Sequence, residues 1–214
     1  ARLERFLQLC AGENIQVVNC TTPSNYFHVL RRQMHRAFRK PLIVMTPKSL
    51  LRHKRCISNI SEFVSKSSFH RILEDDAYVK ANKLIEINKD KRIKKVVMCS
   101  GKIYYDLIEE REKIKNTEVV FVRLEQLYPF PAKTLANVLK RYKSAKFIWC
   151  QEEPKNMGAW NTVRNYIERT LEIINLKDIN VKYVGRKASS STATGNANKH
   201  LAEQKEILEK ILKN

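Results

Sequence analysis

The hydrophobic positions of this chain follow two patterns in turn, and their alternation predicts an α/β fold. Short, continuous apolar runs bounded by polar residues are typical of buried strands. They occur at residues 14–20, 41–45, 94–99, 119–124, 147–150 and 181–184. Apolar residues at helical spacing predict helices at residues 1–10, 22–38, 102–115, 132–142, 159–174 and 198–212. This order favours a parallel or mostly parallel sheet covered by helices on both faces.

A break in the alternation predicts that the chain has two parts. Residues 14–45 contain a strand, a helix and a second strand, which is the pattern of a βαβ unit at the end of a parallel sheet. Thr22 can cap the free amides at the start of the helix, and Pro23 fits its first position, where the missing N–H costs nothing. Between residues 48 and 91 the periodicity fades and basic residues mix with serines, as in a linker. Residues 69–73 could form a strand there.

The stretch FIWCQEEPKNMGAW, residues 147–160, joins a predicted strand to a predicted helix. Glu152, Glu153 and Pro154 are expected to end the strand. Ligands of open α/β sheets gather at the carboxyl ends of strands, so we expect the working surface at this turn. Adjacent side chains on a strand point to opposite faces, so the two glutamates should not act as an acid and base on one substrate atom. One of them should instead pair with a lysine or accept hydrogen bonds from turn amides.

Two loops that contain glycine and hydroxyl residues could hold a phosphate group. They are SGK at residues 100–102 and GRKASSSTATG at residues 185–195. Backbone amides with a nearby cation suit phosphate, which makes Ser100, Lys102 and Arg186 candidate contacts for the phosphate of an effector. Neither loop matches GxxxxGKT or GxGxxG, so an ordinary turn between a strand and a helix is the simpler interpretation.

The histidines do not predict a metal site. His28 and His35 lie seven residues apart on one predicted helix, but Arg31 and Arg32 lie between them and no carboxylate does. His200, at the start of the last predicted helix, is interpreted as a packing or interface residue. We therefore expect no metal ligands.

Composition narrows the function classes. The 214 residues carry a formal charge of +19, from 41 Lys and Arg against 22 Asp and Glu. The lysines are scattered, and neither basic-aromatic interleaving nor zinc-finger spacing accompanies them, so a solvated surface is favoured over nucleic-acid binding. The 5 cysteines form no CxxC pair, which indicates reduced, buried thiols. No apolar run approaches the about 20 residues that span a bilayer, so no membrane interaction is expected.

Several long motifs occur in a fixed order along the chain. They are ERFLQLC at 4–10, TTPSNYFHVLRRQ at 21–33, RKPLIVMTPKSLLRH at 39–53, VVMCSGKIYYDL at 96–107, RLEQLYPFP at 123–131, WCQEEPKNMGAW at 149–160, and YVGR followed by ATG near the end. Together they resemble the carboxyl-terminal region of the decarboxylating first component of the 2-oxoglutarate dehydrogenase complex. The resemblance weakens only at about residues 57–90.

The resemblance implies an α/β fold of the transketolase type and a domain division. Residues 1–51 would end a pyrimidine-binding domain, 52–83 would be a linker, and 84–214 would form a transketolase-like carboxyl-terminal domain. The intact subunit of that family uses thiamine diphosphate and magnesium. Its GDG motif, activating glutamate and substrate histidines would lie upstream. No catalytic or cofactor-binding residue is therefore carried onto this chain, which is expected to be a fragment without decarboxylase activity and without bound cofactor.

The resemblance also implies partners and a compartment. The parent would be a homodimer in a bacterial cytoplasm or mitochondrial matrix and would pass a succinyl group to the dihydrolipoyl succinyltransferase component. The fragment would be structural and form dimer contacts. Freestanding modules that bind an effector or a nucleic acid are the alternatives.

Interface candidates come from two helices. Trp160, with His200 and Leu201 on the last helix, places large side chains beside polar turns, as at a twofold contact. On the helix from Thr22, we expect Tyr26, Phe27 and Leu30 to face the sheet. Successive helical residues lie about 100° apart, so Arg31 and Arg32 cannot both lie in that buried face, and at least one must leave the core. The resemblance implies that this helix packs against another domain, which makes both arginines interface candidates.

Overall fold

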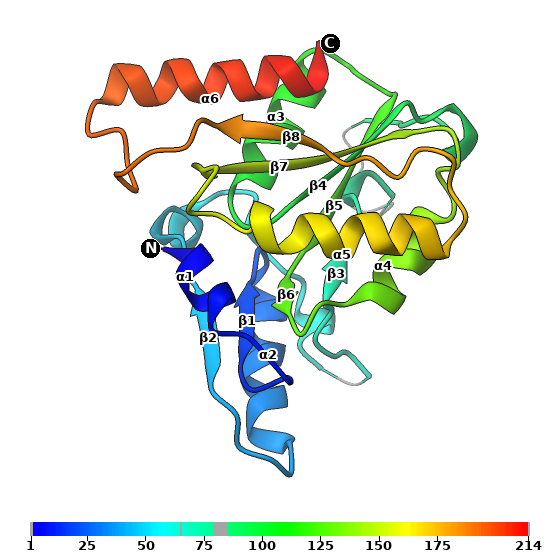
Figure 1. Ribbon diagram of the computed structural model, residues 1–214. Coiled ribbons are helices and arrows are strands. Elements are labelled where there is room, and N and C mark those ends of the chain that lie inside the picture. Colours follow the sequence, from blue (N-terminus) through cyan, green and yellow to red (C-terminus); the bar gives the residue numbers. More distant parts are fainter. Residues whose placement is uncertain (1, 65, 79–84, 214) are drawn as a thin grey trace.

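The computed structural model describes residues 2–64, 66–78 and 85–213, which fold into an α/β structure with two sheets (Figure 1). The expected boundary at residues 83 and 84 lies outside the described residues. The first sheet contains β1 (Gln16–Asn19), β2 (Leu42–Met45) and β6 (Gln126–Tyr128). The second contains β3 (Ile72–Leu73), β4 (Lys95–Cys99), β5 (Val119–Leu124), β7 (Lys146–Pro154) and β8 (Lys182–Arg186).

The first sheet contains the predicted βαβ unit. β1 pairs in parallel with β2, with Val17 opposite Ile43, and α2 (Pro23–His35) connects them. The third strand, β6, pairs antiparallel with β1. The sequence analysis did not predict β6, because a strand of three residues is too short to show an alternating pattern. The first sheet therefore takes one strand from the second part of the chain.

The second sheet is mostly parallel, as predicted. Its strand order is β3-β5-β4-β7-β8, and all neighbours are parallel except the short pair β3 and β5. Chain order and spatial order differ, so helices must cross over between strands. β7 continues through Pro154, four residues beyond the predicted end of its apolar run.

Helices cover both faces of the second sheet (Figure 1). They are α3 (Ile103–Lys113) and α6 (Ala197–Leu212) on one face, and α4 (Ala132–Leu139) and α5 (Trp160–Ile173) on the other. Alternate strand residues supply the two cores. Val96 and Met98 belong to the cluster of α4 and α5, whereas Val97 and Cys99 belong to that of α3 and α6. The α/β fold with helices on both faces is confirmed.

Helix α2 begins as predicted but turns a different face to the sheet. Thr22 accepts a hydrogen bond from the Asn25 amide at 3.3 Å, and Pro23 occupies the first turn. Val29 is fully buried, whereas Phe27 and Leu30 are 43% and 44% exposed. The prediction that Tyr26, Phe27 and Leu30 face the sheet was therefore wrong. The buried stripe contains the polar residues Ser24, Asn25 and His28, which an apolar pattern cannot reveal.

The rest of the described chain consists of short elements. α1 (Leu3–Gln8) packs against α5. Turns of 3-10 helix lie at Lys48–Arg52, Ile60–Glu62, Asp76–Tyr78 and Asp90–Arg92. Within the described ranges, no helix is long and apolar enough to cross a membrane.

Candidate functional site

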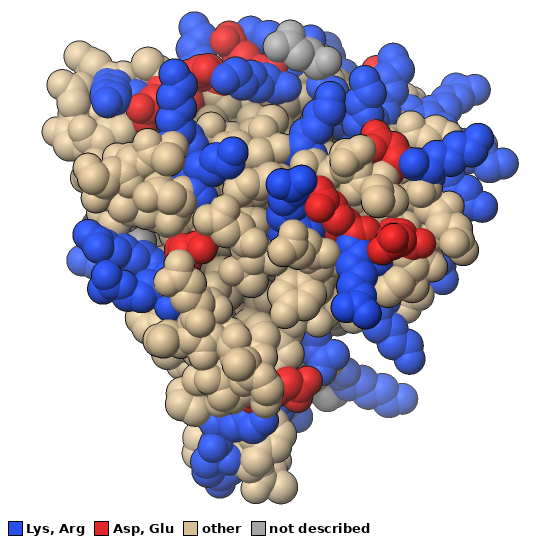
Figure 2. Space-filling view, in the orientation of Figure 1, with Lys and Arg blue, Asp and Glu red and all other residues tan. Residues whose placement is uncertain are grey.

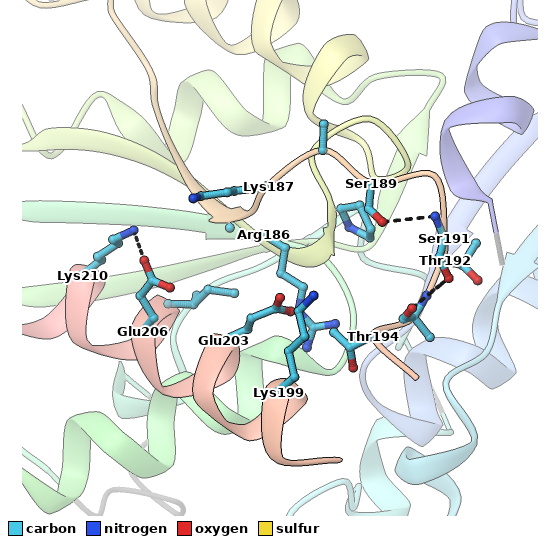
Figure 3. A pocket seen from close by; sticks show the side chains of 15 residues that line it. Arg186, Lys187, Ser189, Ser191, Thr192, Thr194, Lys199, Glu203, Glu206 and Lys210 are labelled. Carbon is cyan, nitrogen blue, oxygen red and sulfur yellow. Dashed lines mark hydrogen bonds and ion pairs between the residues drawn. The ribbon is translucent and has the colours of Figure 1, made fainter. Parts of the chain in front are cut away.

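The carboxyl ends of β4, β7 and β8 surround two adjoining hollows of about 560 Å³ and about 390 Å³. Both are lined by Arg186, Thr192 and Thr194, and together they are called the carboxyl-edge cleft. Residues 185–189 and 191–194, with α6, line the larger hollow (Figure 3). The smaller one also contacts the first sheet, through residues 45–49. A hollow therefore lies at the edge where the sequence placed the working surface.

The SGK turn brings Lys102 to the cleft but not Ser100. Gly101 has φ +79°, and a Cβ there would lie 2.5 Å from Asn19 Nδ2, so the turn needs glycine. Lys102 forms an ion pair with Glu152 inside the smaller hollow. Ser100 is 6% exposed and its hydroxyl donates to the Leu124 carbonyl at 2.9 Å. The prediction of Ser100 as a phosphate contact was wrong, because its hydroxyl is used inside the fold.

Glu152 and Glu153 lie together in the smaller hollow. The regular alternation assumed for them does not hold at this point, because the β7–β8 ladder shifts register between Gln151 and Pro154. The predicted pairing of one glutamate with a lysine is confirmed by Glu152 and Lys102. Burial, and next the charge of Glu152, raise the pKa of Glu153 to about 7. This carboxyl group can therefore hold or release a proton near neutral pH.

Arg186 is fixed by partners on α6. Its Nη2 donates to His200 Nδ1 at 2.7 Å, and its Nε lies 3.3 Å from Glu203 Oε2. Gly185 allows a close approach, since a Cβ there would lie 2.6 Å from the Gln151 carbonyl oxygen. The guanidinium is thus already paired with a carboxylate, which weakens its attraction for a further anion. His200 therefore contacts Arg186 within the chain, and its role at an interface stays a prediction.

Asn156 anchors the loop of residues 185–195. Asn156 Nδ2 donates to the Ser189 carbonyl, and the Ser189 amide donates to Asn156 Oδ1, both at 2.9 Å. Lys187 and Lys199 extend along the cleft, whereas Lys210 is paired with Glu206 at 2.5 Å (Figure 3). The cleft thus combines cations, carboxylates and hydroxyls. It can bind a polar ligand, but it lacks the single sign of charge that a dedicated phosphate site has.

The described residues offer little for nucleophilic or metal chemistry. Burial raises the pKa of Cys99 to about 12, which keeps its thiol protonated. His28 is buried and its Nε2 donates to the Glu62 carbonyl at 2.7 Å, whereas His35 is exposed. No group of three His, Cys, Asp or Glu side chains within the described ranges could hold a metal ion.

The interface candidates fall into exposed and buried groups. Leu201 is 65% exposed on α6, and Arg31 is exposed on α2. Arg32 is partly buried. Trp160 is 6% exposed and its ring lies 5.2 Å from that of Tyr183, within the core. Trp160 therefore offers little surface to a second chain, and Leu201 offers most.

A buried polar network that joins the two sheets was missed by the sequence analysis. Glu125 is fully buried and accepts hydrogen bonds from the Thr21 amide at 2.9 Å, the Thr21 hydroxyl at 2.5 Å and Asn25 Nδ2 at 2.8 Å. Arg123 Nη1 donates to the Thr21 hydroxyl at 3.2 Å. Burial, opposed by Arg123, raises the pKa of Glu125. The charged residues inside the stretch VVFVRLEQL were the available signal.

Comparisons with known proteins agree along the whole chain. Residues 57–212 match the family described as 2-oxoglutarate dehydrogenase C-terminal, and residues 1–54 match the transketolase pyrimidine binding domain. The 2-oxoglutarate dehydrogenase E1 component of Brucella abortus strain S19 is 59% identical over 99% of this chain. That of Brucella ovis is 58% identical over 99% of the chain. The chain spans 21% of the length of each of these relatives.

Proposed function

We propose that this chain forms the carboxyl-terminal part of a subunit that decarboxylates 2-oxoglutarate. The chain belongs to the family of 2-oxoglutarate dehydrogenase E1 components. The observation that carries this proposal is the 59% identity to a protein of that name over 99% of the chain. The subunit would use thiamine diphosphate with magnesium and pass a succinyl group to the dihydrolipoyl succinyltransferase component. The bacterial relatives support a cytoplasmic location.

The described residues do not fit the magnesium diphosphate group. They contain no cluster of three potential metal ligands, and the chain has no GDG motif. No catalytic step is therefore derived from these side chains. We assign the cofactor, the proton transfer and the substrate contacts to the part of the subunit that this chain does not span.

The role that fits these residues is structural. The division into residues 1–51, 52–83 and 84–214 leaves β1 and β2 in the first part and β6 in the last, and the hydrogen bonds of Glu125 to Thr21 and Asn25 join these two parts. A buried carboxylate that three donors satisfy fixes one relative position of the parts that carry them. The chain would thus form one wall of the subunit and contribute contacts to a homodimer.

Binding of a phosphate-bearing effector in the carboxyl-edge cleft is the second candidate function. Effector binding is supported by the cations that line the cleft, Lys102, Arg186, Lys187 and Lys199. Two of these cations are already paired with carboxylates, Lys102 with Glu152 and Arg186 with Glu203, which counts against effector binding.

Nucleic-acid binding is less well supported. Figure 2 shows Lys and Arg side chains spread over the visible face with Asp and Glu among them, rather than gathered in one stripe.

The experiment that tests the main proposal uses the genomic reading frame around this chain. We expect a GDG motif upstream, and we expect the longer protein to reduce ferricyanide when given 2-oxoglutarate, thiamine diphosphate and magnesium. The 214-residue chain should show no turnover above a blank. A longer protein that decarboxylates a different 2-oxo acid, or none, would refute the assignment. A salt-sensitive gel shift with the chain alone would instead favour a nucleic-acid partner.

A further inference from the structure

A second hollow, of about 480 Å³, lies between α2 and residues 67–72, away from the carboxyl-edge cleft. It is called the arginine pocket here. The ionisable side chains that line it are His28, Arg31, Arg32, His35, His70 and Arg71. None of the described residues lining it is Asp or Glu. Its volume lies within the range of small-molecule sites.

The arginines of this pocket differ from the buried arginines elsewhere in the fold. Arg111 is paired with Asp75, and Arg123 with Asp76 at 2.5 Å. Removing a guanidinium from water without a carboxylate costs free energy, which is why such pairs form. Within the described ranges, Arg32 has only the neutral amide of Gln16 as a hydrogen-bond acceptor, at 3.1 Å. Arg71 is exposed, and its guanidinium has no hydrogen-bond or ion-pair partner among the described residues.

Arg32 is held in place, so its charge is directed rather than mobile. Its Cζ lies 4.1 Å above the centre of the Phe69 ring, and its Nη2 donates to Gln16. Burial lowers the pKa of Arg32 to about 10, and the charges of Arg36 and Arg71 contribute to this shift. Arg36 lies outside the pocket, but Arg71 lines it together with Arg32, so an anion bound there would offset the repulsion between these two.

The remaining lining groups suit the oxygen atoms of an anion. Ser67, Ser68 and Thr134 carry hydroxyls beside the guanidinium groups, and His70 and His35 add ring N–H donors. Guanidinium groups bind phosphoryl and carboxylate oxygens with paired N–H donors. We propose that the arginine pocket binds a small oxyanion with at least two negative charges, carried by phosphoryl or carboxylate groups.

The test measures binding by isothermal titration calorimetry at low ionic strength, because exposed charges are screened by salt. Pyrophosphate and citrate serve as separate probes of the phosphoryl and carboxylate classes. Arg32→Gln and Arg71→Gln are the pocket variants. Arg169→Gln is the matched control, because Arg169 is exposed on α5 and does not line the pocket.

We expect at least one probe to bind the parent chain, and its Kd to rise about tenfold in each pocket variant, the loss expected for a charge-assisted hydrogen bond. The control should bind like the parent. Whichever probe binds more tightly identifies the class of anion. If Arg32→Gln fails to fold, the exposed Arg71→Gln decides the question. No binding at millimolar concentration, or equal weakening in Arg169→Gln, would overturn the proposal.

Discussion

Thr21 and Glu125 are 104 positions apart in the sequence, yet the Thr21 hydroxyl donates to a Glu125 carboxylate oxygen at 2.5 Å. Thr21 follows β1 of the first sheet, whereas Glu125 lies between β5 and β6, which belong to different sheets. The bond is fully buried. A low-polarity surrounding strengthens such a bond and makes the loss of either partner costly. The relative placement of the two sheets therefore depends on a carboxylate.

We expect Glu125→Gln to lower the free energy of unfolding by about 1–3 kcal/mol, because an amide has one acceptor oxygen where the carboxylate has two. An NH2 group in the place of Oε2 would face the amide donors of Thr21 and Asn25. In the place of Oε1 it would face the Thr21 hydroxyl, which already accepts from Arg123. Urea denaturation at pH 7 measures the change. Glu172→Gln, on the exposed side of α5, is the control and should stay within about 0.5 kcal/mol of the parent. Equal stability of both variants would mean that the network contributes nothing.

The sequence predicted the helices and most strands because their apolar residues recur with a clear period. It could not predict β6, whose three residues show no period, or the extension of β7, because the register shift at Gln151 depends on pairing with β8. The orientation of α2 was wrong because polar residues such as Asn25 occupy its buried side and bond to distant groups. Such partners are set by tertiary contacts, which local pattern does not encode.

The candidate site shows the same limit. Lys102 and Arg186 reach one cleft, since Lys102 follows β4 and Arg186 ends β8, and the carboxyl ends of these strands share an edge. Ser100 has the right residue type in the right turn, yet its side chain points into the fold and bonds to Leu124. Whether a hydroxyl at such a turn faces the ligand or the core is decided by packing. Sequence predicts where residues gather, but not which of them remain free.

Glu153 should make the stability of the chain depend on pH. Its pKa is 4.5 in the reference state and about 7 in the fold, so the folded state binds more protons between these values. The free energy of unfolding then falls as pH rises from 4.5 to about 7. We expect Glu153→Gln to remove this fall. Between pH 4.5 and pH 8, the free energy of unfolding should therefore decrease by about 2 kcal/mol less in the variant than in the parent.

Urea denaturation across that pH range provides the measurement. Glu172→Gln again provides a control, because its carboxyl group is on an exposed face of α5 and should leave the pH profile unchanged. If parent and Glu153→Gln give parallel profiles, folding does not raise the pKa of Glu153 and the cleft is wetter than its burial indicates.

Self-association should depend on Leu201 rather than Trp160. Leu201 is 65% exposed, so Leu201→Asp removes little from the folded chain but places a charge in any apolar contact that this end of α6 makes. We expect this variant to shift a dimer towards monomer in sedimentation velocity while its melting temperature changes little. If the parent dimerises and Leu201→Asp sediments in the same way, this end of α6 is excluded from the interface.

Trp160→Ala is the matched core variant for that experiment. Trp160 is 6% exposed, so truncation should lower the free energy of unfolding by about 3–5 kcal/mol, through lost burial and the cavity that remains. Association that weakens only in parallel with this loss of stability would reflect partial unfolding. A selective loss of dimer without a loss of stability would restore Trp160 as a contact residue.

Arg31 and Arg32 are adjacent in sequence but differ in what a lysine could replace. Arg32 combines a ring contact at 4.1 Å from Phe69 with a hydrogen bond to Gln16, and a guanidinium plane makes both at once. Arg31 makes, to the described residues, only a 3.4 Å hydrogen bond to the Ser67 carbonyl. We expect Arg32→Lys to lower the stability of this chain by about 1 kcal/mol, and Arg31→Lys to change it by less than about 0.5 kcal/mol. Both substitutions keep the charge, so a loss reports geometry.

In the longer subunit, where α2 would pack against another domain, either substitution should lower activity or dimer stability. Melting curves and steady-state kinetics of both variants that match the parent would identify two solvated arginines.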